Sequence, residues 1–311
     1  MIKKTQEKPN NKKANVFLFF IPYFLTIILG GLIAADFFLR EKITRYSLPL
    51  HIQSVPVHSY PMFRFFYEPY LSAKAAIIMD DESKRLMYVK NPTLRLSTAS
   101  TAKIMTALVA LDYFKPQDIL TVQSDHYEGT VVGFPRGERI AFSDMLYAML
   151  LPSGNDAAYT IAENYPGGIE AFVAKMNEKA KQFHLENSHF ADPAGLEDDG
   201  SFMTVVDLAR LCSEAMKQPI LAGIVGTKEK VFSSESGNVY DVVNINKLLG
   251  TSGVIGIKTG QTSGAGEVLT TAKKEDGRMF IIVVMQSTDR FGDTQSLLNI
   301  VSNNIISFTP N

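Results

Sequence analysis

Hydrophobic residues are most concentrated near the N-terminus of the chain. An apolar run extends from Val16 to Ala35 and is interrupted only by Pro22, Thr26 and two glycines. As a helix, these roughly 20 residues would rise about 30 Å, which matches the hydrocarbon core of a bilayer. The pattern therefore predicts a transmembrane anchor over residues 15–37.

A basic head, residues 1–14, precedes this run and sets its expected orientation. It contains five lysines and a single acidic residue, Glu7. This excess of positive charge predicts a cytoplasmic N-terminus, with everything beyond the anchor outside. A cleaved signal peptide is the alternative. Its apolar region is usually shorter, roughly 7–15 residues, and cleavage after Ala35 would leave Ile33 where a small residue is needed. We therefore expect an uncleaved anchor.

A proline-rich segment, residues 38–70, follows the anchor. It contains Pro49, Pro56, Pro61 and Pro69 together with many aromatic residues. Such a composition is typical of a linker or of an arm packed on a domain, and not of an independent domain. We expect the remaining residues, 71–311, to form one folded domain.

Within residues 71–311 the apolar spacing changes from strand-like to helical. Residues 75–79 and 86–89 are short apolar runs around a polar turn, which predicts a β-hairpin. Helical spacing then dominates to about residue 218. The helices that we expect cover residues 100–113, 144–151 with Ser143 as the N-cap, 156–164 and 169–183, with one more after residue 207.

Strand-like runs return in the last third of the chain. The expected strands cover residues 231–232, 240–243, 255–258, 267–272 and 279–285, and a closing helix covers 296–306. Strands at both ends with helices between them predict an α+β fold. Its antiparallel sheet takes strands from both chain ends, is flanked by helices and carries an inserted helical lobe.

Composition and charge limit the partners, disulfides and metal sites that the chain is expected to have. The chain has 311 residues and a net charge of −1, which gives no reason to expect a nucleic-acid partner. The lone Cys212 cannot form an internal disulfide, and its apolar helical surroundings favour a buried hydrophobe over a reactive thiol. His184 and His189 are five apart, which misses the spacing of a helical zinc pair. We therefore expect no metal and no cofactor.

Three short motifs carry candidate chemistry, and the first supplies a nucleophile with a base. In Ser100-Thr101-Ala102-Lys103, two residues three apart share one face of a helix. A serine hydroxyl needs such a base, and Lys103 must be partly neutral to act as one. Burial and a second cation, for which Lys258 is the candidate, both lower a lysine pKa. The N–H of Ser100 could form half of an oxyanion hole.

The second motif, Ser153-Gly154-Asn155, joins two expected helices. The same triplet recurs at residues 236–238, where a hairpin turn between two strands explains it. Helices on both sides would hold residues 153–155 rigidly, as a catalytic group requires. Ser153 could instead cap a helix, or do both. The amide of Asn155 is suited to orienting a substrate amide.

The third motif, Lys258-Thr259-Gly260, ends an expected strand. Lys258 and Thr259 offer a charge and a hydroxyl to a carboxylate, and Gly260 lets a ligand approach the backbone closely. The N–H of Gln261 could complete the oxyanion hole. Together, in this order, the three motifs indicate a Ser–Lys acyl-transfer enzyme.

With these residues the chain resembles the D-alanyl-D-alanine carboxypeptidases, low-molecular-mass penicillin-binding proteins. The resemblance covers about Leu71 to Phe308 and is carried by residues 98–107, 150–158, 244–249 and 256–262. It implies the β-lactamase/penicillin-binding-protein-like transpeptidase fold. It also implies a peptidoglycan pentapeptide substrate and covalent inhibition by β-lactam antibiotics. Localisation would then be the bacterial cell membrane, with the catalytic domain outside the cytoplasm.

The resemblance also implies a role for each matched residue. Ser100 would be acylated by the penultimate D-alanine carbonyl, Lys103 would be the base and Ser153 would relay protons. Asn155 would hold the peptide amide. The terminal carboxylate would face Lys258, Thr259 and Arg290, although Arg290 could also be a surface arginine at a helix start. Gln261 departs from the aromatic residue or histidine that is commoner there, which leaves fine specificity open.

Three other functions compete with this interpretation. A β-lactamase would need a deacylating glutamate in an E-x-x-x-N pattern, and neither Glu186 nor Glu197 begins one. A non-catalytic penicillin sensor would need a cytoplasmic output domain, for which residues 1–14 are too short. An endopeptidase acting on peptide cross-links would use the same residues, and this alternative stays open.

Overall fold

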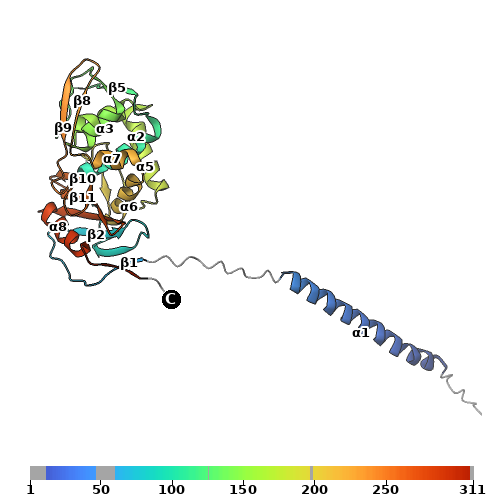
Figure 1. Ribbon diagram of the computed structural model, residues 1–311. Helices are drawn as coiled ribbons and strands as arrows, with labels where there is room; N and C mark the ends of the chain where they lie inside the picture. Colours follow the sequence, from blue (N-terminus) through green and yellow to red (C-terminus); the bar gives the residue numbers. More distant parts are fainter. Residues whose placement is uncertain (1–11, 47–59, 125, 197–198, 309–311) are drawn as a thin grey trace, which may run out of the picture. The chain divides into compact units, whose positions relative to one another are not determined.

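A computed structural model describes residues 12–46, 60–124, 126–196 and 199–308, and its chain divides into two units, Met1–Val57 and His58–Asn311. In the first unit, helix α1 spans Lys12–Tyr46 (Figure 1). Among the described residues, Ile21–Lys42 is the one helical stretch long and apolar enough to cross a membrane. Most of the basic head lies outside the described residues.

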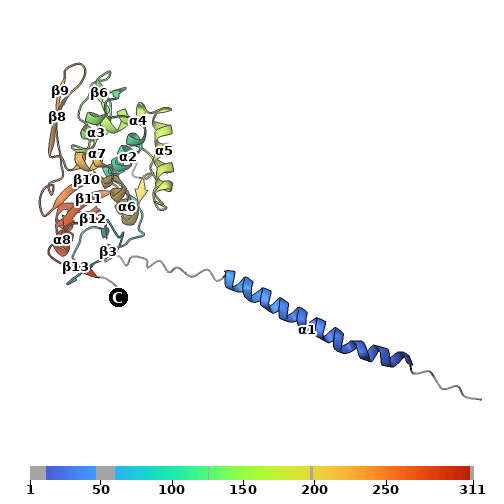
Figure 2. The same cartoon turned by 45° about the vertical axis from the view of Figure 1, so that its right-hand side comes forward.

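The second unit is built on a five-stranded antiparallel sheet (Figure 2). Its order is β10-β11-β12-β2-β3. The strands are β2 Ala75–Asp80, β3 Leu86–Lys90, β10 Val254–Thr262, β11 Gly266–Glu275 and β12 Arg278–Ser287. Because β12 pairs with β2, the two ends of the folded region are neighbours, as the strand pattern predicted.

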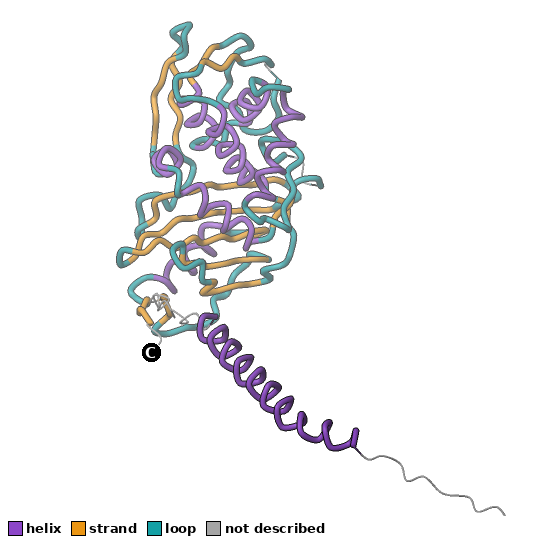
Figure 3. Tube along the Cα trace, turned by 90° about the vertical axis from the view of Figure 1, so that its right-hand side faces the viewer, coloured by secondary structure: helices purple, strands orange, loops and turns teal. Residues whose placement is uncertain are grey.

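The sheet separates two hydrophobic clusters, because alternate residues of a strand point to opposite faces. Ile77 and Ile281 belong to the cluster that includes the helical lobe. Ile78 and Ile282 belong to the other cluster, which includes Leu298 of the last helix. Figure 3 shows the strands running side by side with helices against them. Burial on both faces explains why β2 is apolar from Ala75 to Met79.

The helical lobe is inserted between β3 and β10, and it contains the predicted helices. A 3₁₀ turn, η1, leads directly into α2. Cys212 is fully buried, as its surroundings predicted. The bounds are η1 Ala99–Ala102, α2 Lys103–Tyr113, α3 Phe142–Leu150, α4 Asn155–Glu163, α5 Gly168–Gln182, α6 Val205–Met216 and α7 Pro219–Val225.

Short two-stranded ribbons complete the described part of this unit. The predicted turn at residues 236–238 is confirmed, with Ser234 N–H donating to Asn238 O at 3.0 Å. The pairs are β1 Tyr60–Phe63 with β13 Ile305–Phe308, β4 Leu96–Ser97 with β7 Phe202–Met203, β5 Ile119–Thr121 with β6 Arg139–Ala141, and β8 Glu229–Ser233 with β9 Val239–Val243.

Three local expectations are wrong. The closing helix α8 spans Arg290–Val301, because Asp289 caps its start and Ile305 and Ile306 pair with β1 instead. Strand β10 does not end at the third motif, because pairing with β11 continues to Thr262. Ser143 is not an N-cap, since α3 already begins at Phe142.

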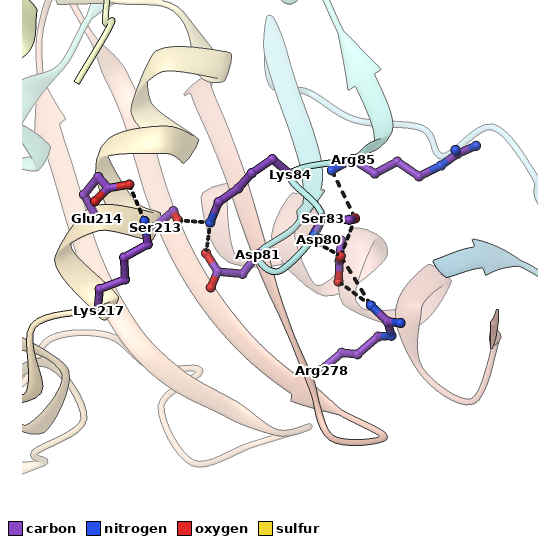
Figure 4. A network of polar contacts seen from close by, with 9 residues as sticks. All are labelled: Asp80, Asp81, Ser83, Lys84, Arg85, Ser213, Glu214, Lys217 and Arg278. Atoms are coloured by element: carbon purple, nitrogen blue, oxygen red, sulfur yellow. Dashed lines mark hydrogen bonds and ion pairs between the residues drawn. The ribbon is translucent and has the colours of Figure 1, made fainter. Parts of the chain in front are cut away.

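A polar network fixes the sheet edge at the β2–β3 turn (Figure 4). The buried carboxylate of Asp80 accepts from Ser83 N at 2.8 Å and lies 3.4 Å from Arg278 of β12. Lys84 bonds Asp81 at 3.0 Å and also reaches Ser213 of α6. These contacts join the turn to both a neighbouring strand and the helical lobe.

Candidate active site

The first motif lies where η1 passes into α2. Lys103 Nζ is 2.9 Å from Ser100 Oγ, as the spacing of three predicts. The residue before Ser100, Ala99, has a positive φ of 45°. Such a backbone is unfavourable for alanine and persists only where the surroundings impose it. The turn thus holds the Ser100 hydroxyl against the lysine.

The amine of Lys103 has two further partners, and both can only accept. Asn155 Oδ1 lies 2.6 Å and Ala194 O 3.0 Å from Nζ. In its neutral form the amine has two N–H groups to donate, and these two acceptors would occupy both. The lone pair would then face the Ser100 hydroxyl, which is the arrangement a general base needs.

Burial makes that neutral form accessible. Lys103 is fully buried, and its burial lowers the amine's pKa to about 7, against an opposing effect of Asp192 and Asp156. Burial, one of the two causes that we expected, is the largest, because an ammonium removed from water loses its hydration.

The second motif supplies Asn155 at the start of α4. Besides meeting Lys103, its side chain donates from Nδ2 to Glu128 O at 2.6 Å. Asp156, the next residue of α4, accepts through its carboxylate from Val132 N at 2.9 Å and Gly133 N at 2.8 Å. The loop that contains residues 128–133 is thereby tied to α4, and the amide oxygen of Asn155 is directed at Lys103. The resemblance implied a substrate contact for this side chain, whereas both of its polar atoms have protein partners here.

Ser153 stands between α3 and α4 with a positive φ of 74°. It does not cap α4, because Gly154 occupies the cap position without a side-chain bond. Its hydroxyl forms no hydrogen bond to the described residues, and the residue is nearly buried. A strained backbone that presents an unengaged hydroxyl two residues from Asn155 is typical of a functional position.

The third motif lies within β10, the edge strand of the sheet, against η1. A Cβ on Gly260 would sit 3.0 Å from Ala99 Cβ and 3.1 Å from Ser100 N. The close approach expected of a ligand is therefore made by η1, the turn that contains Ser100. Lys258 and Thr259 are buried, while Gln261 is exposed.

Several positive charges converge on this strand. The pKa of Lys258 is lowered well below its usual value, first by burial and then by Lys103 and Arg290. Arg290 begins α8 and donates from Nη1 to Gly260 O at 2.9 Å. Its buried Nε has no partner among the described residues. The site thus presents cationic donors to an anion, and Arg290 is not merely a surface arginine.

A turn that the sequence analysis did not single out completes the surroundings of Lys103. Asp192 Oδ1 accepts from Ala194 N at 2.7 Å and Gly195 N at 2.6 Å, which presents Ala194 O to the amine. Gly195 has a φ of 78°, and a Cβ there would fall 1.9 Å from Ala99 O. The turn-forming run Asp-Pro-Ala-Gly was the available sequence signal.

A cavity of about 540 Å³ has Glu128 in its wall, the residue whose backbone oxygen accepts from Asn155 Nδ2. Tyr127 and Tyr159 contribute aromatic surface, with ring centroids 5.7 Å apart. Tyr127 donates to Glu163 Oε2 at 2.9 Å, and burial raises the pKa of both groups, that of Tyr127 to about 12. This space is large enough for part of a peptide ligand beyond the reacting bond.

Comparison with known proteins places these residues in context. Residues 65–289 match the family model described as D-alanyl-D-alanine carboxypeptidase. The D-alanyl-D-alanine carboxypeptidase DacF of Bacillus subtilis is 34% identical over 232 residues, which cover 72% of this chain and 60% of that protein. A D-alanyl-D-alanine endopeptidase of Pseudomonas aeruginosa is 31% identical over 73% of this chain and 76% of its own length.

Solved structures agree with the expected fold. The crystal structure of the Streptomyces K15 DD-transpeptidase matches with a TM-score of 0.72 and 30% identity, over 76% of this chain and 98% of that one. The predicted penicillin-binding-protein-like fold is therefore confirmed. The chain spans less than two thirds of the Bacillus subtilis relative, at 60% of its length.

Proposed function

This chain belongs to the D-alanyl-D-alanine carboxypeptidase family, and from that membership we propose that it removes the terminal D-alanine from peptidoglycan stem peptides. One observation carries the proposal. Lys103 Nζ lies 2.9 Å from Ser100 Oγ while two obligate acceptors occupy its N–H groups. That arrangement suits a neutral amine that takes a proton from the hydroxyl.

In the proposed reaction, Ser100 Oγ attacks the carbonyl of the penultimate D-alanine as Lys103 accepts its proton. The amide C–N bond breaks, and D-alanine leaves with a proton relayed through Ser153. Water then hydrolyses the ester on Ser100 by the reverse proton path. A β-lactam antibiotic would acylate the same oxygen, and its ring nitrogen would take the place of the leaving amine.

The cationic side of the site would bind the substrate's terminal carboxylate. We assign this role to Lys258, Thr259 and Arg290, supported by the unpartnered Nε of Arg290. A bound carboxylate would favour the charged form of Lys258 and so offset the cost of its burial. Backbone N–H groups of Ser100 and Gln261 would hold the oxyanion, and Gly260 would let β10 pack closely against η1.

The decisive experiment is mass spectrometry of the protein after treatment with penicillin. We expect an adduct on Ser100, no labelling of Ser100→Ala by fluorescent penicillin, and release of D-alanine from a pentapeptide by the unmodified protein. Labelling that persists in a folded Ser100→Ala variant would refute the assignment.

An endopeptidase activity on cross-linked peptides is the second candidate. A relative with that name is as similar to this chain as several of the carboxypeptidases are. Both reactions release an amine from the same D-alanine carbonyl, and they differ in the size of that leaving group. Turnover of a pentapeptide compared with that of a cross-linked dimer distinguishes them.

For localisation, we propose that α1 anchors the protein in the bacterial cell membrane with the second unit outside the cytoplasm. The Ile21–Lys42 stretch supports this, because it is exposed over its whole length and has the length of a bilayer core. A peptidoglycan substrate requires the same side of the membrane.

A further inference from the structure

The ribbon formed by β1 and β13 has one face that is wholly apolar and another that is apolar except for Ser307. In its register, Tyr60 lies opposite Phe308 and Met62 lies opposite Ile306, so these four residues share one face. On the other face, Phe63 and Ile305 pack against the core. A ribbon with one solvated face normally alternates apolar with polar residues. Here the outer face, Tyr60, Met62, Ile306 and Phe308, lacks that polar alternation.

This outer face is exposed in the second unit. The exposed fractions are 36% for Met62, 39% for Ile306 and 44% for Phe308. The ring of Tyr60 lies 5.3 Å from that of Phe308. The guanidinium of Arg85 sits 4.3 Å above the Tyr60 ring. Strand β1 precedes and strand β13 follows residues 65–289, so both lie outside the part of the chain that matches the family model.

The segment after β1 extends the same character. Phe65, Phe66, Tyr67 and Tyr70 follow Arg64, and their exposed fractions are 73%, 52%, 57% and 95%. Aromatic rings and arginines together are typical of the lipid–water interface, where the rings enter the apolar boundary and the guanidinium groups meet phosphates.

The chain length between anchor and ribbon identifies the occupant of this face. The candidate membrane span ends at Lys42, α1 continues to Tyr46, and strand β1 begins at Tyr60. The roughly 13 residues between α1 and β1 could reach at most about 45 Å even if fully extended, so the tether limits how far the ribbon can lie from the bilayer. Such tethering raises the effective concentration of a weakly binding surface at its target.

We propose that the outer face of the β1–β13 ribbon seats the catalytic unit on the lipid surface of the membrane that α1 spans. The inference rests on the anchoring under the proposed function. Docking would hold the active site at a set height above the bilayer instead of anywhere within the reach of the tether.

The absence of tryptophan from the sequence makes this testable in the full-length protein. Phe308→Trp would place a single reporter on the outer face, and Tyr113→Trp would place one at an exposed position at the end of α2 as the control. Each variant is reconstituted into phosphatidylglycerol–phosphatidylethanolamine liposomes with ordinary or brominated acyl chains. We expect brominated lipid to quench more than about half of the Phe308→Trp emission and to leave Tyr113→Trp unchanged. Adding Ile306→Glu should restore most of the lost emission.

Equal emission of both reporters in brominated and ordinary lipid would overturn the inference. So would a blue-shifted but unquenched Phe308→Trp, because residues 47–59 or a second copy of the chain would then cover the face. Fluorescent-penicillin labelling of the same liposomes tests the proposed function separately. Labelled but unquenched protein refutes only the docking, and quenched but unlabelled protein refutes only the enzymatic assignment.

Discussion

Lys103 is the residue on which the proposed chemistry depends most. Its amine is buried, bonded to two acceptors and directed at Ser100. Burial disfavours the charged ammonium form of a lysine and so lowers its pKa. At Lys103 the result is an amine that is partly neutral near neutral pH, as a base must be. Asn155 and the Ala194 carbonyl keep the lone pair aimed at the hydroxyl, so orientation and protonation state have separate structural causes.

The pH dependence of acylation follows from the pKa of Lys103, which burial lowers to about 7. The reactive form is the unprotonated amine, so the rate should rise with pH through this value and level off above it. Well below it, labelling by fluorescent penicillin should fall roughly tenfold per pH unit. Initial labelling rates in matched buffers measure this. Lys103→Arg, which stays charged, should label at no pH, and a flat profile for the unmodified protein would contradict the assignment.

Ser153 allows backbone strain and hydroxyl chemistry to be separated. Its φ of 74° suits glycine better than any residue with a Cβ. Ser153→Gly should therefore be more stable than Ser153→Ala by about 1 kcal/mol of unfolding free energy, and it should unfold at a higher temperature. Both variants lose the hydroxyl, so both should lose most D-alanine release. Equal thermal stability of the two, measured by calorimetry, would show that the position is unstrained.

At the scale of elements, the site is assembled where η1, α4, β10 and the turn at residues 192–195 meet. The sequence predicted α2 to α6 and the strands of the five-stranded sheet, because each has a local apolar period, and it missed α7 and the short strands β1 and β4 to β7. It did not predict that β10 extends past the third motif, or that residues 305–308 form a strand. Both depend on pairing partners elsewhere in the chain, which override a local change toward polar residues.

Gly195 tests how closely these elements must approach. A Cβ there would overlap Ala99 O at 1.9 Å, next to the nucleophile. Gly195→Ala should cost about 3 kcal/mol of stability and abolish penicillin labelling, because the turn before Ser100 must move. Gly237→Ala is the matched control, since Gly237 has a φ of 86° with open space around it.

The control variant, Gly237→Ala, should lose only about 1 kcal/mol of unfolding free energy and keep full penicillin labelling. Chemical denaturation and fluorescent-penicillin labelling of both variants give the comparison. Normal labelling by Gly195→Ala would mean that the contact with Ala99 does not position the nucleophile.

At the scale of the whole molecule, Asp293 ties the start of the sheet region to its end. Its carboxylate accepts from Ser72 N at 2.8 Å, Ala73 N at 2.7 Å and the hydroxyl of Ser287 at 2.6 Å. Burial raises the pKa of this carboxyl, but the hydrogen bonds from Ser287, Ser72 and Ala73 together lower it by more. The net pKa is therefore below its usual value.

A carboxyl whose pKa is lower in the folded state stabilises the protein above its unfolded pKa and loses that effect as pH falls. Asp293→Asn should therefore reduce the unfolding free energy by about 2 kcal/mol at neutral pH, and by less in strong acid where the native carboxyl is also protonated. Urea denaturation of both proteins across this range measures the difference. The same loss at every pH would show that shape, and not charge, sets the role of Asp293.

Much of the candidate site was accessible from the amino-acid sequence. Ser100 and Lys103 are three apart, so helical geometry alone brings them together. Lys258 and Gly260 were identified by their motif, and Arg290 by its resemblance to the family. The contribution of Asp192, Ala194 and Gly195 was not, because a short loop gives no periodic signal and its importance lies in what it touches.

The order of the elements of the central sheet, the apolar N-terminal helix and the approach of Lys103 to Ser100 follow from the sequence by itself, since each arises from interactions within a few residues. Only the tertiary structure decided that the amide oxygen of Asn155 meets Lys103, 52 positions away, and that Ala194 O meets the same amine from 91 positions away. It also decided that Gly260 and Gly195 both pack on the turn of the nucleophile. Such contacts depend on how the sheet and the helical lobe close on each other, and no local pattern of residues specifies that closure.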